Sequence, residues 1–260
     1  MRPARVVHEL RATARKRGPL YGPWPLGRRR VLPSLIAPVT APPSERLLDV
    51  ALQAIAAARS VSLDALASRL DAPAPPADGG PRRRGLHRPP KNPDMWPGEH
   101  YKLLVALVEL LQPKTIVELG TATGMSALTM KAALAQDAKL VTFDVVRWQE
   151  YRGGLLREED FADGRLEQRL DDLSTPDGWQ QNAELLRSAE LIFVDAKHDG
   201  AQERGFVRGF EQVGLARGPI VVFDDIRLWS MLSFWQELAR PKLDLTSFGH
   251  WSGTGLVDYA

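Results

Sequence analysis

The 260-residue sequence contains no cysteine, so disulfide bonds, thiolate metal ligands and cysteine nucleophiles are excluded. No apolar run approaches about 18 residues, and we therefore expect no membrane-spanning segment. The N-terminus carries arginines but lacks the continuous apolar core of a signal peptide, so we expect a cytoplasmic protein. The composition, 44% hydrophobic and 25% charged, is typical of a globular protein.

The net charge is small, but it is unevenly distributed. Residues 1–98 contain 17 Lys and Arg against 7 Asp and Glu, a net charge of +10, whereas residues 99–260 contain 17 against 25, a net charge of −8. A basic front on an acidic body predicts an arm that docks on its own domain, a partner subunit or an acidic substrate. The absence of interleaved aromatic residues and of a known binding motif beside the arginines argues against a nucleic-acid partner. Assembly into a homo-oligomer stays open.

The front of the chain is rich in proline and arginine, and residues 1–43 predict irregular structure with one short helix at most. Ser44 is placed to cap a helix over Glu45–Arg59, and a shorter helix is predicted over Leu63–Leu70. Residues 71–93 have the composition of a linker. We therefore divide the chain into a basic, Pro-rich N-terminal arm with a helical lid (1–96) and a main domain (97–260).

The main domain is organised around the stretch TIVELGTATGMS, residues 115–126. Its first five residues predict a buried parallel strand, and Met125–Leu134 has the apolar spacing of a helix. Gly120 and Gly124 bound a tight turn between the two, where the backbone can approach a ligand at a helix N-terminus. The turn lacks the middle glycine of GxGxxG, and no GK[ST] follows, which excludes a Walker loop.

A second predicted strand, Lys139–Phe143, ends in Asp144, and an acid there can accept both hydroxyls of a ribose. The segments ELGTATGMS and TFD together resemble the cofactor half of class I S-adenosylmethionine-dependent methyltransferases. An NAD-type Rossmann unit is the alternative. The resemblance implies that Glu118, Gly120 and Ser126 lie along the methionine part of S-adenosylmethionine and Asp144 on its ribose. The full set of expected cofactor-binding residues is Glu118, Gly120, Thr121, Gly124, Ser126, Asp144 and Asp172.

Asp172 follows a third predicted strand, Arg165–Leu170, and the resemblance implies that it bonds the adenine amino group. The alternative is an acid near the N-terminus of the next helix. The remaining strands are predicted over 190–194, 219–223, 243–248 and 255–259, and the helices over 98–111, 176–188, 200–215 and 228–239. This alternation predicts an α/β fold with a doubly wound, mostly parallel seven-stranded sheet of the Rossmann-like methyltransferase type, preceded by a helical and irregular extension.

Three acids end neighbouring strands: Asp195 ends the fourth, and Asp224 with Asp225 ends the fifth. Carboxylates brought to one edge of a sheet repel one another unless a cation compensates, and oxygen ligands suit Mg²⁺. This spacing is similar to that of the cation-dependent O-methyltransferases, which include catechol and antibiotic-sugar methyltransferases. The alternative is that these aspartates only cap helices and line the cofactor cleft.

A base is also needed, and His198 lies where this family commonly places a lysine or histidine. Lys197 is the second candidate. We expect transfer of a methyl group to a hydroxyl of a small molecule such as a diol, a catechol or a natural-product sugar, with His198 removing the proton. Two alternatives stay open: a methyltransferase that uses the basic arm on RNA or protein, and a non-methylating relative of the kind associated with cephalosporin hydroxylation.

Overall fold

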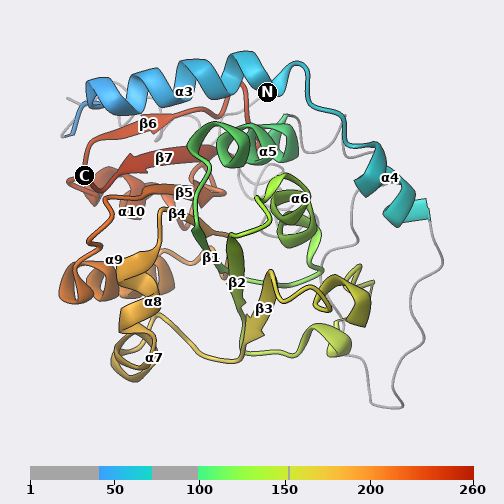
Figure 1. Ribbon diagram of the computed structural model, residues 1–260. Coiled ribbons are helices and arrows are strands. Elements are labelled where there is room, and N and C mark those ends of the chain that lie inside the picture. The colour runs from blue at the N-terminus through green and yellow to red at the C-terminus, as the bar shows by residue number, and fades with distance from the viewer. Residues whose placement is uncertain (1–40, 72–98, 152) are drawn as a thin grey trace, which may run out of the picture.

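The computed structural model describes residues 41–71, 99–151 and 153–260 (Figure 1). The predictions for the chain before residue 41 and for the linker after residue 71 lie outside these residues. Within the described ranges, no helix is long and apolar enough to cross a membrane.

Among the described residues, a seven-stranded sheet forms the centre of the domain, in the order β3-β2-β1-β4-β5-β7-β6. The strands are β1 (Thr115–Leu119), β2 (Lys139–Phe143), β3 (Leu166–Arg169), β4 (Leu191–Val194), β5 (Ile220–Asp224), β6 (Lys242–Asp244) and β7 (Thr254–Asp258). The first five pair in parallel, and β7 runs antiparallel to both β5 and β6. The predicted doubly wound, mostly parallel sheet is therefore confirmed. Since the strand order reverses at β1, a ligand crevice is expected where β1 and β4 end.

Helices cover both faces of this sheet (Figure 1). One face packs against α3 (Glu45–Ala58), α5 (His100–Leu111) and α6 (Met125–Ala133), and the other against α8 (Ala183–Ser188), α9 (Ala201–Val213) and α10 (Leu232–Glu237). The smaller elements are α4 (Asp64–Asp71), α7 (Pro176–Gln181), η2 (Trp148–Glu150) and η3 (Glu158–Asp160). Along β1, Ile116 packs in the core on the α3, α5 and α6 side of the sheet, and Val117 packs in the core on the α8, α9 and α10 side. The two side chains point in opposite directions because successive strand residues face opposite sides of a sheet.

The helix α3 begins at its predicted cap, where the Ser44 side chain accepts a hydrogen bond from Leu47 N at 3.1 Å. One side of α3 is buried against α5 and β7. At its start, Ser44 Oγ donates to Asp258 on β7 at 2.5 Å, and Arg46 forms an ion pair with the same carboxylate. This helix therefore shares the core of the domain that follows it, while the division of the chain at residue 96 stays a prediction.

Most predicted elements shift by only one or two residues, but three differ more strongly from the prediction, each for a local reason. The helix predicted over 176–188 is two helices, because Asn182 leaves helical geometry and its side chain bonds Gly178 O and Asp171. The helix predicted from 228 begins at Leu232, since tight turns follow Asp225. The strand predicted over 243–248 ends at Asp244, whose side chain accepts a hydrogen bond from Thr246 N and turns the chain.

Candidate functional site

The glycine turn lies against the end of β4. Gly120 has φ +106°, and a Cβ on it would lie 1.8 Å from the carbonyl oxygen of Asp195. Gly124 has φ +79°, and a Cβ there would lie 2.2 Å from the Leu156 side chain. Only glycine fits at these two positions, because they combine left-handed backbone geometry with close neighbours. The turn therefore brings the first predicted cofactor segment into direct contact with the strand that ends in Asp195.

Glu118 is fully buried on β1, and one of its carboxylate oxygens accepts a hydrogen bond from Ser126 Oγ at 2.5 Å. The other oxygen, Oε2, is buried and has no hydrogen-bond partner among the described residues. Burial raises the pKa of Glu118 to about 8, although the Ser126 hydrogen bond opposes the shift. A buried carboxylate oxygen without a partner is costly for the protein alone.

Asp144 holds the glycine turn as well as facing the crevice. Its Oδ2 accepts a hydrogen bond from Ala122 N at 3.0 Å, and its Oδ1 accepts one from Val146 N at 3.0 Å. Beside it, the hydroxyls of Thr121 and Thr142 are 2.8 Å apart and both residues are buried. The Thr121 side chain therefore braces β2 and does not face the crevice, whereas Asp144 does.

A pocket of about 270 Å³ opens at the carboxyl ends of the parallel strands. Its lining contains five of the predicted residues, which are Gly120, Asp144, Asp172, Asp195 and Lys197, together with Tyr151. Asp172 Oδ1 accepts hydrogen bonds from the backbone N and the hydroxyl of Ser174. The structure thus brings Asp144 and Asp172 to one pocket, and Asp172 also orders the chain before α7. Its bond to the adenine amino group stays a prediction.

Two of the three predicted metal ligands, Asp195 and Asp225, lie beside His198. Its Nε2 lies 3.1 Å from Asp195 Oδ1 and 3.6 Å from Asp225 Oδ2. Asp224 and Asp225 are both buried at the end of β5. The two strand ends therefore share one acidic cluster, as the sequence predicted.

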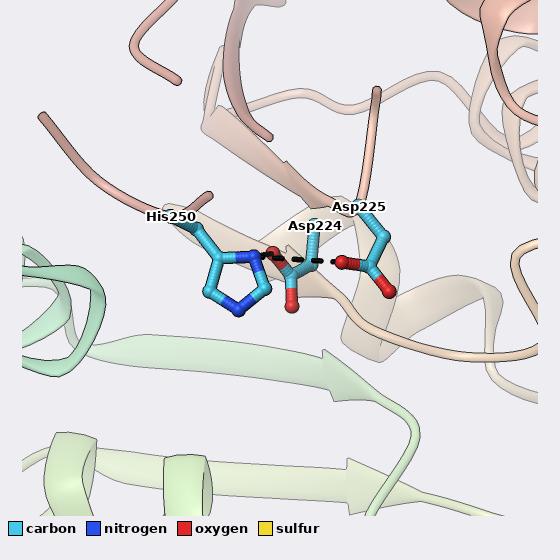
Figure 2. Close-up of side chains that lie close together, drawn as sticks. All are labelled: Asp224, Asp225 and His250. Atoms are coloured by element: carbon cyan, nitrogen blue, oxygen red, sulfur yellow. Dashed lines mark ion pairs between the residues drawn. The ribbon is translucent and has the colours of Figure 1, made fainter. Parts of the chain in front are cut away.

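In the described part of the chain, one group of three residues that could hold a metal ion differs from the predicted set. It contains Asp224, Asp225 and His250, whose ligand atoms all lie within 4.8 Å of one another (Figure 2). Asp195 is outside this group. His250 lies between β6 and β7, and its Nδ1 is 3.5 Å from Asp224 Oδ1 and 3.4 Å from Asp225 Oδ1. The sequence analysis missed this residue, because no spacing relates it to the strand-end acids.

A third imidazole, also missed, belongs to His100 at the start of α5. The ring is almost completely buried, its Nδ1 is 3.4 Å from Thr254 Oγ1 and 3.9 Å from Asp224 Oδ1, and its centroid is 5.0 Å from that of His250. Burial lowers the pKa of His100 to about 3, and the neighbouring His250 adds to the shift. His100 is therefore a neutral ring in the folded protein.

The two candidate bases lie in different surroundings. His198 Nε2 faces the carboxylates, whereas the exposed Lys197 ammonium forms an ion pair with Asp199 at 2.8 Å. Burial alone would lower the pKa of His198, but the hydrogen bond to Asp195 and the nearby carboxylate charges outweigh it and raise the pKa to about 10. The geometry favours His198 over Lys197 as the group that can reach a reacting atom at the cluster.

The loop that carries His198 is held in an uncommon conformation. His198 has φ +55° and Asp225 has φ +58°, and both are positions where a side chain costs conformational energy. The completely buried Glu203 on α9 fixes the backbone at His198, because its carboxylate accepts hydrogen bonds from His198 N at 2.9 Å and from Gly200 N at 2.7 Å. Strain of this kind is retained where surrounding contacts impose it, which is common at functional sites.

Comparison with known proteins gives an independent result. A family model described as a methyltransferase domain matches residues 117–226. Among solved structures, a candidate O-methyltransferase from Klebsiella pneumoniae is 20% identical, and the alignment covers 80% of this chain and 96% of that one with a TM-score of 0.50. A protein from Corynebacterium glutamicum is 15% identical over 78% of this chain and 93% of that one, also with a TM-score of 0.50. A search of curated proteins finds no match.

Identities this low show a shared fold, and the family match covers the part of the chain that holds the glycine turn and all three strand-end acids. Both findings agree with the resemblance drawn from ELGTATGMS and TFD, and they favour it over the NAD-type alternative. Residues 117–226 therefore match a methyltransferase domain, and the chain shares its fold with the two solved structures.

Proposed function

We propose that this protein transfers a methyl group from S-adenosylmethionine to a hydroxyl oxygen of a small molecule, with help from a divalent cation. The observation that carries the proposal is the position of Asp195. This residue lines the cofactor pocket, and its carboxylate lies 3.1 Å from His198 Nε2 in the acidic cluster. A donor in the pocket and an acceptor at the cluster would therefore meet at one place.

The residues at the site fit both S-adenosylmethionine and a divalent cation. For the cofactor, Gly120 and Asp144 line the pocket, and the Glu118 carboxylate, whose Oε2 has no hydrogen-bond partner among the described residues, is suited to an ammonium donor. For the cation, Asp224 Oδ1 is a buried oxygen without a hydrogen-bond partner among the described residues, next to a second carboxylate. When bound, S-adenosylmethionine supplies an electrophilic methyl group and a divalent cation acidifies a coordinated hydroxyl. The sequence predicted Mg²⁺ for this role, held by Asp195, Asp224 and Asp225.

The residues of the site then have separate roles. Glu118 and Asp144 bind and orient the two ends of the cofactor, and the strand-end aspartates orient the acceptor oxygen. A cation bound to the aspartates would offset the negative charges that raise the pKa of His198, and Nε2 would then be free to accept the hydroxyl proton as the oxygen becomes the nucleophile. The backbone of His198, fixed by Glu203, keeps Nε2 at the cluster, so that orientation contributes a large part of the rate increase.

Oxygen-rich ligation of this kind suits an acceptor with two neighbouring oxygens, such as a vicinal diol, a catechol or a hydroxy-carbonyl compound. The candidate O-methyltransferase from Klebsiella pneumoniae, which shares the fold, is consistent with transfer to oxygen. The alternative acceptors, RNA and protein, depend on the basic front of the chain, most of which lies outside the described residues.

The test is methyl transfer from labelled S-adenosylmethionine to a panel of catechols, diols and sugars, with bulk tRNA and protein as competing acceptors. We expect label on a small diol or catechol, loss of transfer after treatment with EDTA and recovery with added cation. Transfer that continues unchanged in EDTA would remove the cation from the proposal, and label on tRNA or protein alone would remove the small-molecule acceptor.

A variant pair sharpens this test. Asp224→Asn removes one buried carboxylate charge at nearly constant volume, and we expect at least about a tenfold loss of cation affinity by calorimetry. Asp137→Asn is the matched control, because Asp137 is exposed and forms an ion pair with Lys114 on the surface. Equal cation affinity in the two variants would contradict the role of the strand-end acids.

A further inference from the structure

The predicted metal site contains only carboxylate ligands, but imidazole rings also lie beside the acidic cluster. Imidazole rings from three separate parts of the chain, His100, His198 and His250, each have a nitrogen within 3.9 Å of a strand-end carboxylate oxygen. His250 approaches two of these oxygens at once, one from Asp224 and one from Asp225 (Figure 2). A site made for Mg²⁺ would need only oxygen ligands.

A second observation points to a ligand at the same place. Asp224 is 6% exposed, and its Oδ1 has no hydrogen-bond partner among the described residues. This oxygen is the one that faces His250 Nδ1 at 3.5 Å, which is too long for a hydrogen bond. The burial of a carboxylate oxygen without a partner costs free energy, and a bound cation would remove that cost.

The distances match those of two atoms that share one ion. Ligands about 2.1 Å from a metal are about 3.4 Å apart at a tetrahedral angle and about 3.0 Å apart at a right angle. His250 Nδ1 lies 3.4 Å from Asp225 Oδ1 and 3.5 Å from Asp224 Oδ1. Little movement of the three side chains would therefore bring them to ligand distance from a common ion.

Ser252 contacts two members of this group. Its hydroxyl donates to Asp225 Oδ1 and lies 2.5 Å from His250 Nδ1. A hydroxyl can accept from Nδ1–H while it donates to a carboxylate, so a bound ion would replace this hydrogen bond of His250. Asp224 Oδ1 stays without a hydrogen-bond partner among the described residues.

We propose that His250 Nδ1 is a metal ligand, which makes the centre a mixed nitrogen–oxygen site of Asp224, Asp225 and His250. Imidazole is a ligand for first-row transition metals, whereas Mg²⁺ is held by oxygen. The centre therefore takes an ion such as Mn²⁺, Fe²⁺, Co²⁺ or Zn²⁺ in preference to Mg²⁺. This inference rests on the proposed cation dependence and names the class of cation and the ligand that selects it.

The experiment uses the full chain, freed of metal by a chelator and then loaded with Mn²⁺ or Mg²⁺. Calorimetry should show that Mn²⁺ binds at least about tenfold more tightly than Mg²⁺. Pulsed EPR of the Mn²⁺-loaded protein should show coupling to a directly bound nitrogen. His250→Gln should remove this coupling and weaken Mn²⁺ at least about tenfold, while Mg²⁺ affinity changes little.

His100→Gln is the matched control for an imidazole in the cluster that is not proposed as a ligand. We expect it to keep the nitrogen coupling, and loss of coupling in this variant but not in His250→Gln would overturn the assignment. The wild-type spectrum tests the proposal even where a variant fails to fold, because Mn²⁺ bound without nitrogen coupling contradicts it directly.

The outcomes separate this inference from the function on which it rests. Mn²⁺ binding without nitrogen coupling, or Mg²⁺ binding at least as tightly as Mn²⁺, overturns the nitrogen ligand but leaves a cation-assisted methyltransferase. Absence of any divalent-ion binding overturns the cation in both proposals. Calorimetry with S-adenosylmethionine on the metal-free protein then shows separately whether the methyltransferase function itself stands.

Discussion

Replacement of Gly120 by alanine tests whether the cofactor turn and the end of β4 form one unit. The added Cβ would lie 1.8 Å from the Asp195 carbonyl oxygen and 2.7 Å from its carbonyl carbon, whereas real Cβ atoms essentially never approach below 3.0 Å. The neighbour is backbone and cannot rotate away, so the ends of β1 and β4 must separate by more than 1 Å. The hydrogen bond from Asp195 N to Leu119 O, 2.9 Å long, would be stretched or lost.

The free-energy cost has two parts. Alanine at φ +106° costs about 1–3 kcal/mol of backbone strain, and the forced shift of a packed strand costs about 1–3 kcal/mol more. We therefore expect Gly120→Ala to lower the free energy of unfolding by about 2–6 kcal/mol. S-adenosylmethionine affinity should fall at least about tenfold, because both the turn and Asp195 line the pocket.

Gly164→Ala is the matched control. Gly164 also has a positive φ, +71°, but a Cβ there would meet nothing within 4 Å. This variant should lose only about 1–2 kcal/mol and should bind the cofactor normally, as measured by urea denaturation and calorimetry. If Gly120→Ala loses no more stability than Gly164→Ala and keeps its cofactor affinity, the close contact between the turn and β4 does not exist.

Two further predictions concern ionisable groups. In the folded protein the pKa of Glu118 is raised to about 8 from an ordinary value of 4.5. The folded state therefore binds this proton more tightly than the unfolded state does, and the free energy of unfolding falls as pH rises from about 5 to 8. Glu118→Gln should reduce this fall by a few kcal/mol in urea denaturation at pH 5.5 and 8.5, and equal slopes in both proteins would contradict the buried carboxyl. His198→Gln should lower kcat about 10²–10⁴-fold and leave the affinity for S-adenosylmethionine unchanged. Lys197→Ala should keep most of the activity. A larger loss of kcat in Lys197→Ala than in His198→Gln would make Lys197 the base.

The sequence was informative wherever a functional residue lies at a fixed place in a local pattern. The strand that carries Glu118, the turn between Gly120 and Gly124, and the acids at the ends of β2, β4 and β5 could all be predicted, because strand, turn and helix each have a short-range signal. The order of elements also predicted the sheet, since parallel strands joined by helices bring their carboxyl ends to one edge. The predicted pocket residues and strand-end acids consequently lie close together in the structure.

Other features of the site could not be predicted from any local pattern. His100 precedes the first strand and His250 follows the fifth, and only the antiparallel return of β7 beside β5, together with the packing of α5, brings their rings to Asp224. The contact of Gly120 with Asp195 depends likewise on two strands 75 residues apart in the sequence. The sequence by itself therefore determined which acids gather at one edge of the sheet, because strand polarity is a local property. Tertiary packing alone decided which imidazoles reach those acids, because such contacts leave no periodicity in the chain.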